Sequence, residues 1–391
     1  MEKSSKNTDK KPINTLTTKN EPKEEGILEV LSSGYGFLRK EENSYSQCDD
    51  DVYLKSQEIK KFGLRTGDKI ECEVRDPNGR DKEKYRSVSK ILSINSGPSN
   101  PIKLTHFSKL TPCFADERIL LETNKLEIST RICDLIAPLG KGQRGLIIAP
   151  PKAGKTFLLK KIANSIVDKN PDIHVFILLV DERPEEVTDF KESVPRAVVI
   201  SSTFDQHPKR HIQVTEMTIE RAKRIVESGG DVVILMDSIT RVARAYNLVE
   251  PSSGRTLSGG IDVNALQKPK KIFGAARNTR EAGSLTILAT ALVDTGSKMD
   301  DIIFEEFKGT GNMELCLDRK ISDSRIYPAI NIAKSGTRRE ELLITKDELE
   351  RMWVLRKHMN SVGASESIQM LIEKMKKTES NVDFLLNLRV N

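Results

Sequence analysis

The sequence predicts an α/β domain, in which helices cover a parallel sheet, preceded by a small β-barrel. Residues 26–95 carry short strand signals that are broken by turns. Beyond residue 110, apolar strand signals alternate with helical segments, as in a sheet covered by helices. A phosphate-binding pattern joins one of these strands to a helix at residues 149–156. A chain of 391 residues is long enough for two or three domains with sizeable cores.

The composition limits the compartment and the partners of the chain. Lysine and arginine number 63 and aspartate and glutamate 57, so the net charge of +6 permits a nucleic-acid partner without requiring one. The five cysteines are scattered without a C-x-x-C pair, which favours a reducing compartment. The sequence shows neither a secretory signal nor an apolar run of the ~18 residues that a membrane span needs. We therefore expect a cytoplasmic protein without membrane association.

The amino-terminal part of the chain divides into a polar tail, a barrel and a linker. Residues 1–25 contain six lysines and five acidic residues but few large apolar groups, so we expect a disordered tail. Five strand signals within residues 26–95, with a strong turn at 76–79, predict a five-stranded barrel. Residues 96–110 contain Gly97, Pro98 and Pro101 and are expected to link it to the α/β domain, residues 111–391.

Aromatic residues in the predicted barrel favour a surface for single-stranded nucleic acid. Residues 33–39 place Tyr35 and Phe37 on one face of a strand, with Arg39 two residues further on. Rings beside a cation can stack unpaired bases and contact phosphate, although such rings can also fill a barrel interior. Together with the Asp-Asp-Val-Tyr segment 50–53, residues 34–38 resemble the paired motifs of cold-shock domains, a form of the OB fold. Tyr85, in a charged neighbourhood, is a further candidate.

The phosphate-binding pattern is the centre of the predicted chemistry. Residues 146–148 supply a strand, and an apolar-faced helix begins at Phe157. Backbone N–H groups at such a helix start stabilise an anion. Lys155 can reach the β- and γ-phosphates, and the Thr156 hydroxyl can coordinate Mg²⁺. Ala149 stands where the pattern has its first glycine, so a chance Gly-Lys-Thr helix start is the alternative.

Two later strands end in carboxylates at the predicted ligand-binding edge of the sheet. The run 175–180 ends in Asp181-Glu182, and Glu182 could polarise the water that attacks the γ-phosphate. The run 232–236 ends in Asp237, which could hold hydrated Mg²⁺. The alternative for Glu182 is a solvated charge at a strand end. Between these strands we expect a helix over 212–228, with His207 and His211 at its solvated start.

Several polar segments could contact a polynucleotide or a neighbouring subunit. Residues 250–260, with Arg255, and residues 294–300, with Lys298, form small polar loops that could approach a sugar-phosphate backbone or be surface excursions. Arg338, after a flexible Ser-Gly pair, suits a contact with a neighbour's γ-phosphate, or else a surface salt bridge. Residues 140–145, Gly-Lys-Gly-Gln-Arg-Gly, form a flexible cationic turn that enters the first buried strand.

Taken together, these residues resemble the family of the bacterial transcription termination factor Rho. The most telling segments are residues 145–156, 181–188, 237–241 and 307–315, and the match runs from about Gly26 to the end. The resemblance implies a RecA-like P-loop ATPase with an OB/cold-shock-like RNA-binding domain. It further implies a homohexameric, RNA-dependent ATPase and 5′-to-3′ RNA–DNA helicase that acts on nascent RNA. The implied partners are single-stranded RNA, the RNA polymerase elongation complex and the elongation factor NusG.

The resemblance also assigns roles to individual residues. It implies catalytic roles for Glu182, Lys155, Arg338 and Asp237, with Thr156 and Asp237 at Mg²⁺. The implied ATP-binding residues are Gly140, Lys141, Gly142, Gln143, Arg144, Gly145, Lys152, Ala153, Gly154, Lys155, Thr156, Phe157, Arg183 and Tyr327. The implied RNA-binding residues are Gly34, Tyr35, Gly36, Phe37, Leu38, Arg39, Asp51, Val52, Tyr53, Glu83, Lys84, Tyr85, Arg255 and Lys298.

The sequence departs from the family pattern at three places. Tyr327 stands where the family usually has phenylalanine, and Arg255 where a lysine is common. The helical bundle that often precedes the barrel has no counterpart in residues 1–25, which are too short and too polar. Two other functions remain as alternatives: a RecA-like ATPase without RNA coupling, and an RNA-binding protein in which the nucleotide is only a structural ligand.

Overall fold

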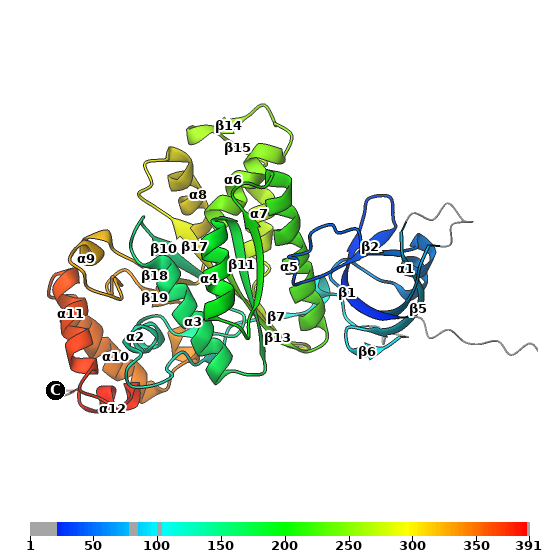
Figure 1. The fold of residues 1–391 in the computed structure, drawn as a ribbon. Coiled ribbons are helices and arrows are strands. Elements are labelled where there is room, and N and C mark those ends of the chain that lie inside the picture. Colours follow the sequence, from blue (N-terminus) through cyan, green and yellow to red (C-terminus); the bar gives the residue numbers. More distant parts are fainter. Residues whose placement is uncertain (1–21, 78–84, 100–103, 389–391) are drawn as a thin grey trace, which may run out of the picture.

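The computed structural model describes residues 22–77, 85–99 and 104–388. Figure 1 shows a small barrel domain (blue) beside a larger α/β domain, with the carboxyl-terminal helices (orange and red) at the opposite end. The two-domain fold predicted from the sequence is confirmed.

The barrel is a curled sheet with the strand order β3-β2-β1-β4-β5-β6, closed by a pairing of β3 with β5 at Tyr53 and Ser87. Its interior is apolar, with Leu28 and Ile70 fully buried. The first strand begins at Lys23, three residues before the predicted start of the barrel at Gly26, because the backbone of residues 23–25 pairs with β4 although their side chains are polar. The elements are β1 Lys23–Val30, β2 Gly36–Arg39, β3 Val52–Leu54, α1 Ser56–Phe62, β4 Lys69–Arg75, β5 Ser87–Ile94 and β6 Gly97–Pro98.

The α/β domain is built on a seven-stranded sheet with the order β12-β11-β13-β17-β10-β18-β19. Its first six strands are parallel, and only β19 is antiparallel. The carboxyl ends of the parallel strands therefore meet at one edge, where open α/β sheets bind ligands. The strands are β10 Arg144–Ala149, β11 Ile173–Glu182, β12 Val198–Thr203, β13 Asp231–Asp237, β17 Leu285–Leu292, β18 Met313–Cys316 and β19 Gly336–Thr337.

Helices cover both faces of this sheet, which explains why its central strands are continuous apolar runs. Along β11 the side chains alternate: Ile177 and Leu179 enter the core on one face, whereas Leu178 and Val180 enter the core on the other. The first face carries α2 Ile128–Ile136, α3 Lys155–Lys169, α4 Pro184–Ser193, α10 Lys346–Met359, α11 Ala364–Met375 and α12 Asn381–Leu386. The second face carries α5 Pro208–Glu227, α6 Ile239–Val249, α7 Gln267–Phe273 and α8 Lys298–Lys308.

Short elements complete the α/β domain. The segment predicted as a linker ends in a 3-10 turn, η1 Phe107–Lys109, and Phe107 is buried in the α/β core with its N–H donating to Glu227 Oε1 at 2.7 Å. Residues 100–103, including Pro101, lie outside the described residues. The other short elements are β7 Pro112–Cys113, β8 Arg118–Ile119, β9 Leu139–Gly140, β14 Thr256–Leu257, η2 Ser258–Gly260, β15 Ile261–Asp262, β16 Asn278–Thr279, α9 Arg319–Asp323 and η3 Glu340–Leu342.

Candidate nucleotide site and nucleic-acid surface

The predicted phosphate loop joins the carboxyl end of β10 to the amino end of α3. Lys152 and Gly154 both have positive φ, 64° and 84°, so the backbone curls between the strand and the helix. Successive N–H groups in such a turn form a concave site for an anion. Ala149 is the fully buried last residue of β10, where its small side chain fits the core. Its presence at the first position of the pattern therefore does not disturb the strand-loop-helix arrangement.

Lys155 lies between the two predicted carboxylates. Its Nζ is 2.6 Å from Asp237 Oδ1 and 3.9 Å from Glu182 Oε2, and both acids are almost fully buried. The Thr290 hydroxyl on the neighbouring strand β17 also donates to Asp237 Oδ1, at 2.7 Å. The structure thus brings together three predicted catalytic residues that are distant in sequence. In this structure the Lys155 ammonium is paired with the Asp237 carboxylate.

Glu182 has the protonation equilibrium of a general base. Burial and the nearby charge of Asp237 raise its pKa to about 7, against the opposing effects of Lys155 and Arg241. A base whose pKa lies near the working pH is ionised and still basic enough to accept a proton in catalysis. The Glu182 Oε2 atom is buried and finds no hydrogen-bond partner among the described residues. It is therefore available to a water molecule in the site.

The same site fits a magnesium ion that is held mainly by phosphate oxygens and water. Asp237 Oδ2 is buried and has no hydrogen-bond partner within the part of the chain that the structure describes, while Thr156 Oγ1 lies 3.3 Å from Glu186 Oε2. Among the described residues no group of three or more His, Cys, Asp or Glu could hold a metal ion. Mg²⁺ does not need such a cage, because it is usually held by one or two protein ligands together with substrate phosphates.

Two residues that the sequence reasoning did not assign shape the position of Glu182. Asp181 has φ 56° and forms a bulge between β11 and β12, so the strand turns just before Glu182. Arg241, in the first turn of α6, lies 3.7 Å from the carboxylates of Asp181 and of Glu182. The signal for Arg241 was its place four residues after the strand-ending Asp237, where a helix begins beside the site.

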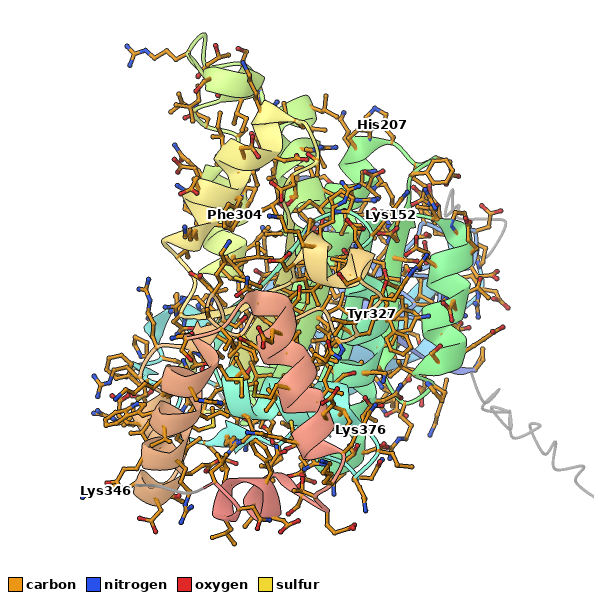
Figure 2. The ribbon with its side chains drawn as sticks, turned by 90° about the vertical axis from the view of Figure 1, so that its left-hand side faces the viewer. Lys152, His207, Phe304, Tyr327, Lys346 and Lys376 are labelled. Atoms are coloured by element: carbon orange, nitrogen blue, oxygen red, sulfur yellow. The ribbon has the colours of Figure 1, made fainter. Side chains whose placement is uncertain are left out.

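Two exposed rings border the phosphate loop. Phe157, in the first turn of α3, is 60% exposed, and Tyr327 is 46% exposed. The Tyr327 ring lies so close to Gly154 that an added Cβ there would be 3.3 Å from it. Figure 2 looks onto the face that carries Lys152 and Tyr327. Lys152 and Arg183 are exposed. The predicted ATP-binding residues around the loop therefore leave an open, ring-lined entrance.

The predicted ATP-binding residues 140–145 do not lie at this entrance. Residues 140–143 precede β10, and Arg144 and Gly145 are its first two residues, so most of the strand, which rises about 3.3 Å per residue, lies between them and the loop. Lys141 pairs with Asp231 at 2.8 Å, and Gln143 donates to Asn312 Oδ1 at 2.8 Å. These residues therefore lie at the other end of β10 from the phosphate loop of their own chain, and the ATP-binding role that the resemblance implies for them stays a prediction.

Arg338 also lies at this opposite edge of the sheet. It follows β19, which pairs with the start of β18, and its N–H donates to Asn312 O at 2.9 Å. Its exposed side chain lines a cavity of about 400 Å³ with Arg144, Arg339 and Phe114. Arg338 therefore cannot reach the phosphate loop of its own chain, which leaves only a neighbouring chain for the role predicted from the sequence.

The aromatic residues of the barrel gather on one face. The Tyr53 ring centroid lies 5.4 Å from that of Tyr35 and 5.8 Å from that of Phe37, and the Phe37 and Tyr85 centroids are 5.2 Å apart. Tyr85 is 39% exposed, whereas Phe37 is almost buried beneath its neighbours. We call Tyr35, Phe37, Tyr53 and Tyr85 the aromatic face. It has the rings needed to stack unpaired bases.

Arg39 supports the aromatic face from below. Its guanidinium lies 5.0 Å from the Phe37 centroid, donates to Glu29 Oε2 at 2.7 Å and also pairs with Asp51. In this structure both Arg39 and Asp51 are buried, and the phosphate contact predicted for Arg39 stays a prediction. Leu38 and Val52 fill the barrel interior. Gly34 lies in the turn that precedes β2, and Gly36 is the first residue of β2. Glu83 and Lys84 lie outside the described residues.

The two predicted polynucleotide loops lie side by side. Gly259, in η2, approaches the start of α8 so closely that an added Cβ would lie 3.0 Å from the Lys298 backbone. Arg255 and Lys298 are both exposed, and Figure 1 places β14 and α8 together at one end of the domain. The structure thus brings two separate cationic loops onto one protruding surface.

His207 and His211 have different environments. His207 caps the start of α5 and accepts from Lys209 N, as expected of an exposed helix start. His211 is 5% exposed and its Nδ1 lies 2.8 Å from Ser202 Oγ. The expectation of a solvated position is therefore wrong for His211, because α5 begins at Pro208 and turns this residue onto β12.

The fold and the site define the class of this protein as a P-loop ATPase with an attached OB-like barrel. Residues 129–337 match the nucleotide-binding domain of the ATP synthase alpha/beta family, and residues 24–100 match the RNA-binding domain of Rho termination factor. The chain is 55% identical over 364 residues to transcription termination factor Rho of Pseudomonas aeruginosa, covering 92% of this chain and 86% of the relative. It is 56% identical to that of Aquifex aeolicus, covering 92% and 83%. The chain belongs to the Rho family.

Solved structures agree on the fold of the larger domain. An ATPase from the type III secretion system of pathogenic bacteria is similar with a TM-score of 0.60 at 20% identity, covering 76% of this chain and 93% of that chain. An ATP synthase subunit from Nanoarchaeum equitans gives 0.57 at 17%, covering 70% and 73%. Across the described ranges, no helix is long and apolar enough to cross a membrane.

Proposed function

We propose that this chain is an RNA-dependent ATPase of the Rho type, which terminates transcription by moving along nascent RNA and releasing it from RNA polymerase. The observation that carries the proposal is the presence in one chain of a buried Glu182–Lys155–Asp237 cluster and of an aromatic face on a barrel that is attached to the same sheet. The relatives named above are transcription termination factors, and they supply the biological context. In this role the protein works in the cytoplasm on an elongation complex, with NusG as a further partner.

The residues of the site divide the chemistry of ATP hydrolysis among them. Lys155 exchanges its pairing with Asp237 for the β- and γ-phosphates, and Glu182 accepts a proton from the attacking water. Thr156 and the unpaired Asp237 Oδ2 hold the hydrated magnesium ion. When bound, that ion neutralises charge on the phosphates and orients them. Phe157 and Tyr327 flank the adenine at the entrance.

We further propose that each site is completed by a neighbouring subunit in a homohexamer. The support is the position of Arg338 at the sheet edge opposite to Lys155. An interface that joins unlike edges of identical chains closes into a ring when the rotation permits it. Arg338 then stabilises charge on the γ-phosphate of the adjacent chain, as arginine fingers do.

A mixing experiment tests the shared site. Lys155→Ala and Arg338→Ala should each abolish ATP hydrolysis in homogeneous assemblies. When the two variants are mixed before assembly, some interfaces combine the intact Lys155 of one chain with the intact Arg338 of the other. We expect these interfaces to restore part of the activity. Mixtures as inactive as the separate variants, at the same subunit number, would show that both residues serve one chain.

A second experiment tests the coupling to RNA. The purified protein is assayed for ATP hydrolysis with single-stranded RNAs, with single-stranded DNAs and without nucleic acid. We expect single-stranded RNA to stimulate hydrolysis and Tyr53→Ala to weaken binding to the barrel. An unchanged rate with every strand would favour a RecA-like ATPase without RNA coupling, and RNA binding without any turnover would favour a non-enzymatic RNA-binding protein.

A further inference from the structure

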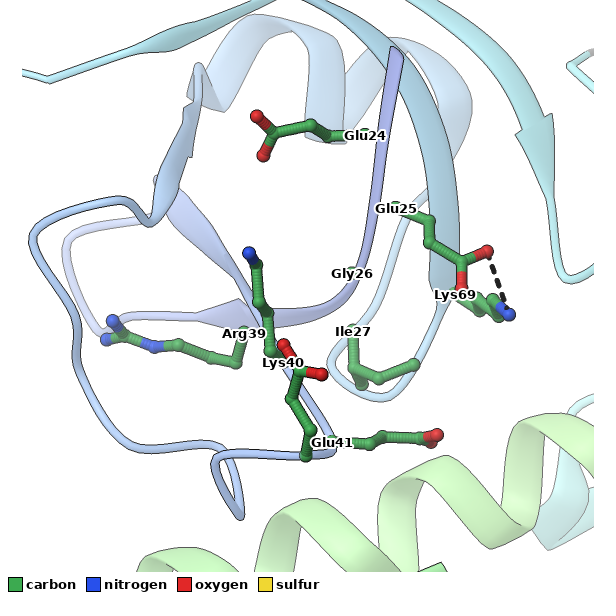
Figure 3. Close-up of a pocket in the computed structure, with 9 residues that line it drawn as sticks. Glu24, Glu25, Gly26, Ile27, Arg39, Lys40, Glu41 and Lys69 are labelled. Carbon is green, nitrogen blue, oxygen red and sulfur yellow. Dashed lines mark ion pairs between the residues drawn. The ribbon is translucent and has the colours of Figure 1, made fainter.

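The loop that connects β2 to β3, residues 40–51, attaches the barrel to the α/β domain; we call it the barrel loop. Tyr45 at its centre is fully buried in the core of the α/β domain, on the face covered by α5 and α6. Ser44 and Tyr45 both have positive φ, 52° and 61°, which turns the loop toward that domain. Figure 3 shows Lys40 and Glu41, where the barrel loop leaves β2, beside a helix of the α/β domain (pale green).

Arg210 on α5 holds the barrel loop through three hydrogen bonds, which we call the grip. Its guanidinium donates to Tyr45 O at 3.1 Å and to Ser46 Oγ at 2.7 Å, and it also donates to Ser44 O. A fourth bond, of 2.7 Å, goes to Gln213 Oε1 one turn further along the helix. Arginine is suited to this task because it presents five donors in a fixed plane. One side chain thus ties three successive residues of the barrel loop to α5.

The grip is connected to the aromatic face. Gln213 donates through Nε2 to Glu29 Oε1, and the other oxygen of Glu29 accepts from Arg39 at 2.7 Å. Arg39 in turn supports the Phe37 ring and pairs with Asp51, the last residue of the barrel loop. A base or a phosphate that engages Arg39 competes with Glu29 and Asp51 for the same guanidinium. RNA on the aromatic face would therefore act on Glu29, which links to Gln213, and on Asp51, which ends the barrel loop.

The grip is also connected to the catalytic strand. Ser44 Oγ accepts from Ser201 N on the outer edge of β12 at 3.0 Å, and Ser202 is held by His211 of α5. The inner edge of β12 pairs with β11, with Thr203 opposite Glu182 beyond the Asp181 bulge. Phe204 N donates to Glu182 O at 3.1 Å. One strand thus separates the barrel loop from the proposed catalytic base.

From this continuous set of contacts we infer that Arg210 is a positioning residue that transmits RNA occupancy of the aromatic face to Glu182. The inference rests on the proposed RNA-dependent hydrolysis. Arg210 belongs neither to the aromatic face nor to the Glu182–Lys155–Asp237 cluster, so its loss should leave both sites formed while it interrupts the connection between them. A connection of this kind qualifies as coupling only if it changes one site's response to the other's ligand.

Arg210→Met tests the inference, because methionine keeps part of the apolar stem and removes all the donors. The matched control is Arg196→Met, which removes an exposed arginine that pairs with Asp168 and, among the described residues, makes no hydrogen bond or ion pair with the barrel loop. Each variant is assayed for subunit number, for binding of a labelled single-stranded RNA, and for ATP turnover with and without that RNA. We expect Arg210→Met to bind RNA within about threefold of the unaltered protein and to keep the RNA-free turnover. Its stimulation by saturating RNA should fall at least fivefold, while Arg196→Met should behave like the unaltered protein.

The outcomes separate the inference from the proposed function. If RNA does not stimulate the unaltered protein, the proposed function itself fails. If RNA stimulates Arg210→Met as strongly as the unaltered protein, or if the variant loses RNA binding in parallel with stimulation, the inference is overturned. Gln213→Leu provides a second test that leaves the three bonds from Arg210 to the barrel loop in place and removes the bonds of Gln213 to Arg210 and to Glu29. It should also lower stimulation at saturating RNA, and full stimulation in this folded variant would overturn the route through Glu29.

Discussion

Replacement of Glu182 by glutamine should abolish ATP hydrolysis and at the same time stabilise the fold at alkaline pH. Both expectations come from the same pKa, which burial and the neighbouring Asp237 raise from about 4.5 to about 7. Glutamine has nearly the shape of a protonated glutamate and cannot accept the proton of the attacking water. Loss of a general base typically lowers the rate by about 10² to 10⁴-fold.

The size of the stabilisation follows from the linkage between protonation and folding. Between pH 4.5 and pH 7 the folded chain retains on Glu182 a proton that the unfolded chain has released, so the free energy of unfolding falls as the pH rises. Above pH 7 the free energy of unfolding is lowered by the full amount, and below pH 4.5 it is not lowered. A shift of this size corresponds to about 3 kcal/mol in the free energy of unfolding. Glu182→Gln should recover on the order of this amount at pH 8.5 and almost none at pH 4.5.

Thermal or urea unfolding of the unaltered protein and of Glu182→Gln at both pH values measures this difference. We expect the variant to gain stability relative to the unaltered protein only at the higher pH. Asp189→Asn serves as the control, because Asp189 is an exposed carboxylate on α4 that pairs with Lys160 away from the site. A gain of equal size at both pH values, or a loss at pH 8.5, would refute the assigned burial and charge environment of Glu182.

Three further predictions address the catalytic site, the RNA surface and the domain contact. Arg241→Met removes a cation 3.7 Å from Glu182, so the pKa of Glu182 should rise. In a plot of kcat/KM against pH, the range in which activity increases with pH should therefore move to higher pH. A profile that does not move would contradict the pairing of Arg241 with Glu182. Tyr53→Ala removes the central ring of the aromatic face and should weaken binding of single-stranded RNA, measured by fluorescence anisotropy, by about 1–3 kcal/mol, with turnover in the absence of RNA unchanged. Tyr45→Phe removes a buried hydroxyl that has no hydrogen-bond partner in the described ranges, so urea unfolding should show unchanged or slightly higher stability, whereas Tyr45→Ala should cost about 3–5 kcal/mol. A large loss in the phenylalanine variant would reveal a partner for the hydroxyl.

The fold could be predicted because local sequence patterns indicate its central strands and helices. The run 175–180 is apolar on both faces of a strand, as a sheet covered on both sides by helices requires, and the structure distributes it between two cores. Glu182 and Asp237 could be placed together because parallel strands end at a common edge. The beginning of β1 was missed because Lys23–Glu25 pair through the backbone, which needs no apolar side chain.

The parts of the site that escaped prediction depend on contacts between distant segments. Arg241 faces Glu182 only because α6 starts beside β11, which no periodicity reveals. The ATP-binding role of residues 140–145 stays a prediction, and the sequence did not reveal that most of β10 separates them from the phosphate loop of their own chain. Tyr45 gave no signal as a core residue because it lies in a polar loop of one domain and fills the interior of the other.

The hydrogen bond from Ser201 to the barrel loop has a consequence for attempts to study the larger domain by itself. It occupies a backbone donor on the outermost strand of the sheet, beside the place that Tyr45 fills. A fragment that began after residue 104 would keep every residue of the nucleotide site. Its edge strand β12 would have an unpaired backbone donor, beside the apolar site that Tyr45 fills in the full chain. Such edges recruit strands from other molecules, so excision of the barrel should favour self-association of the truncated protein.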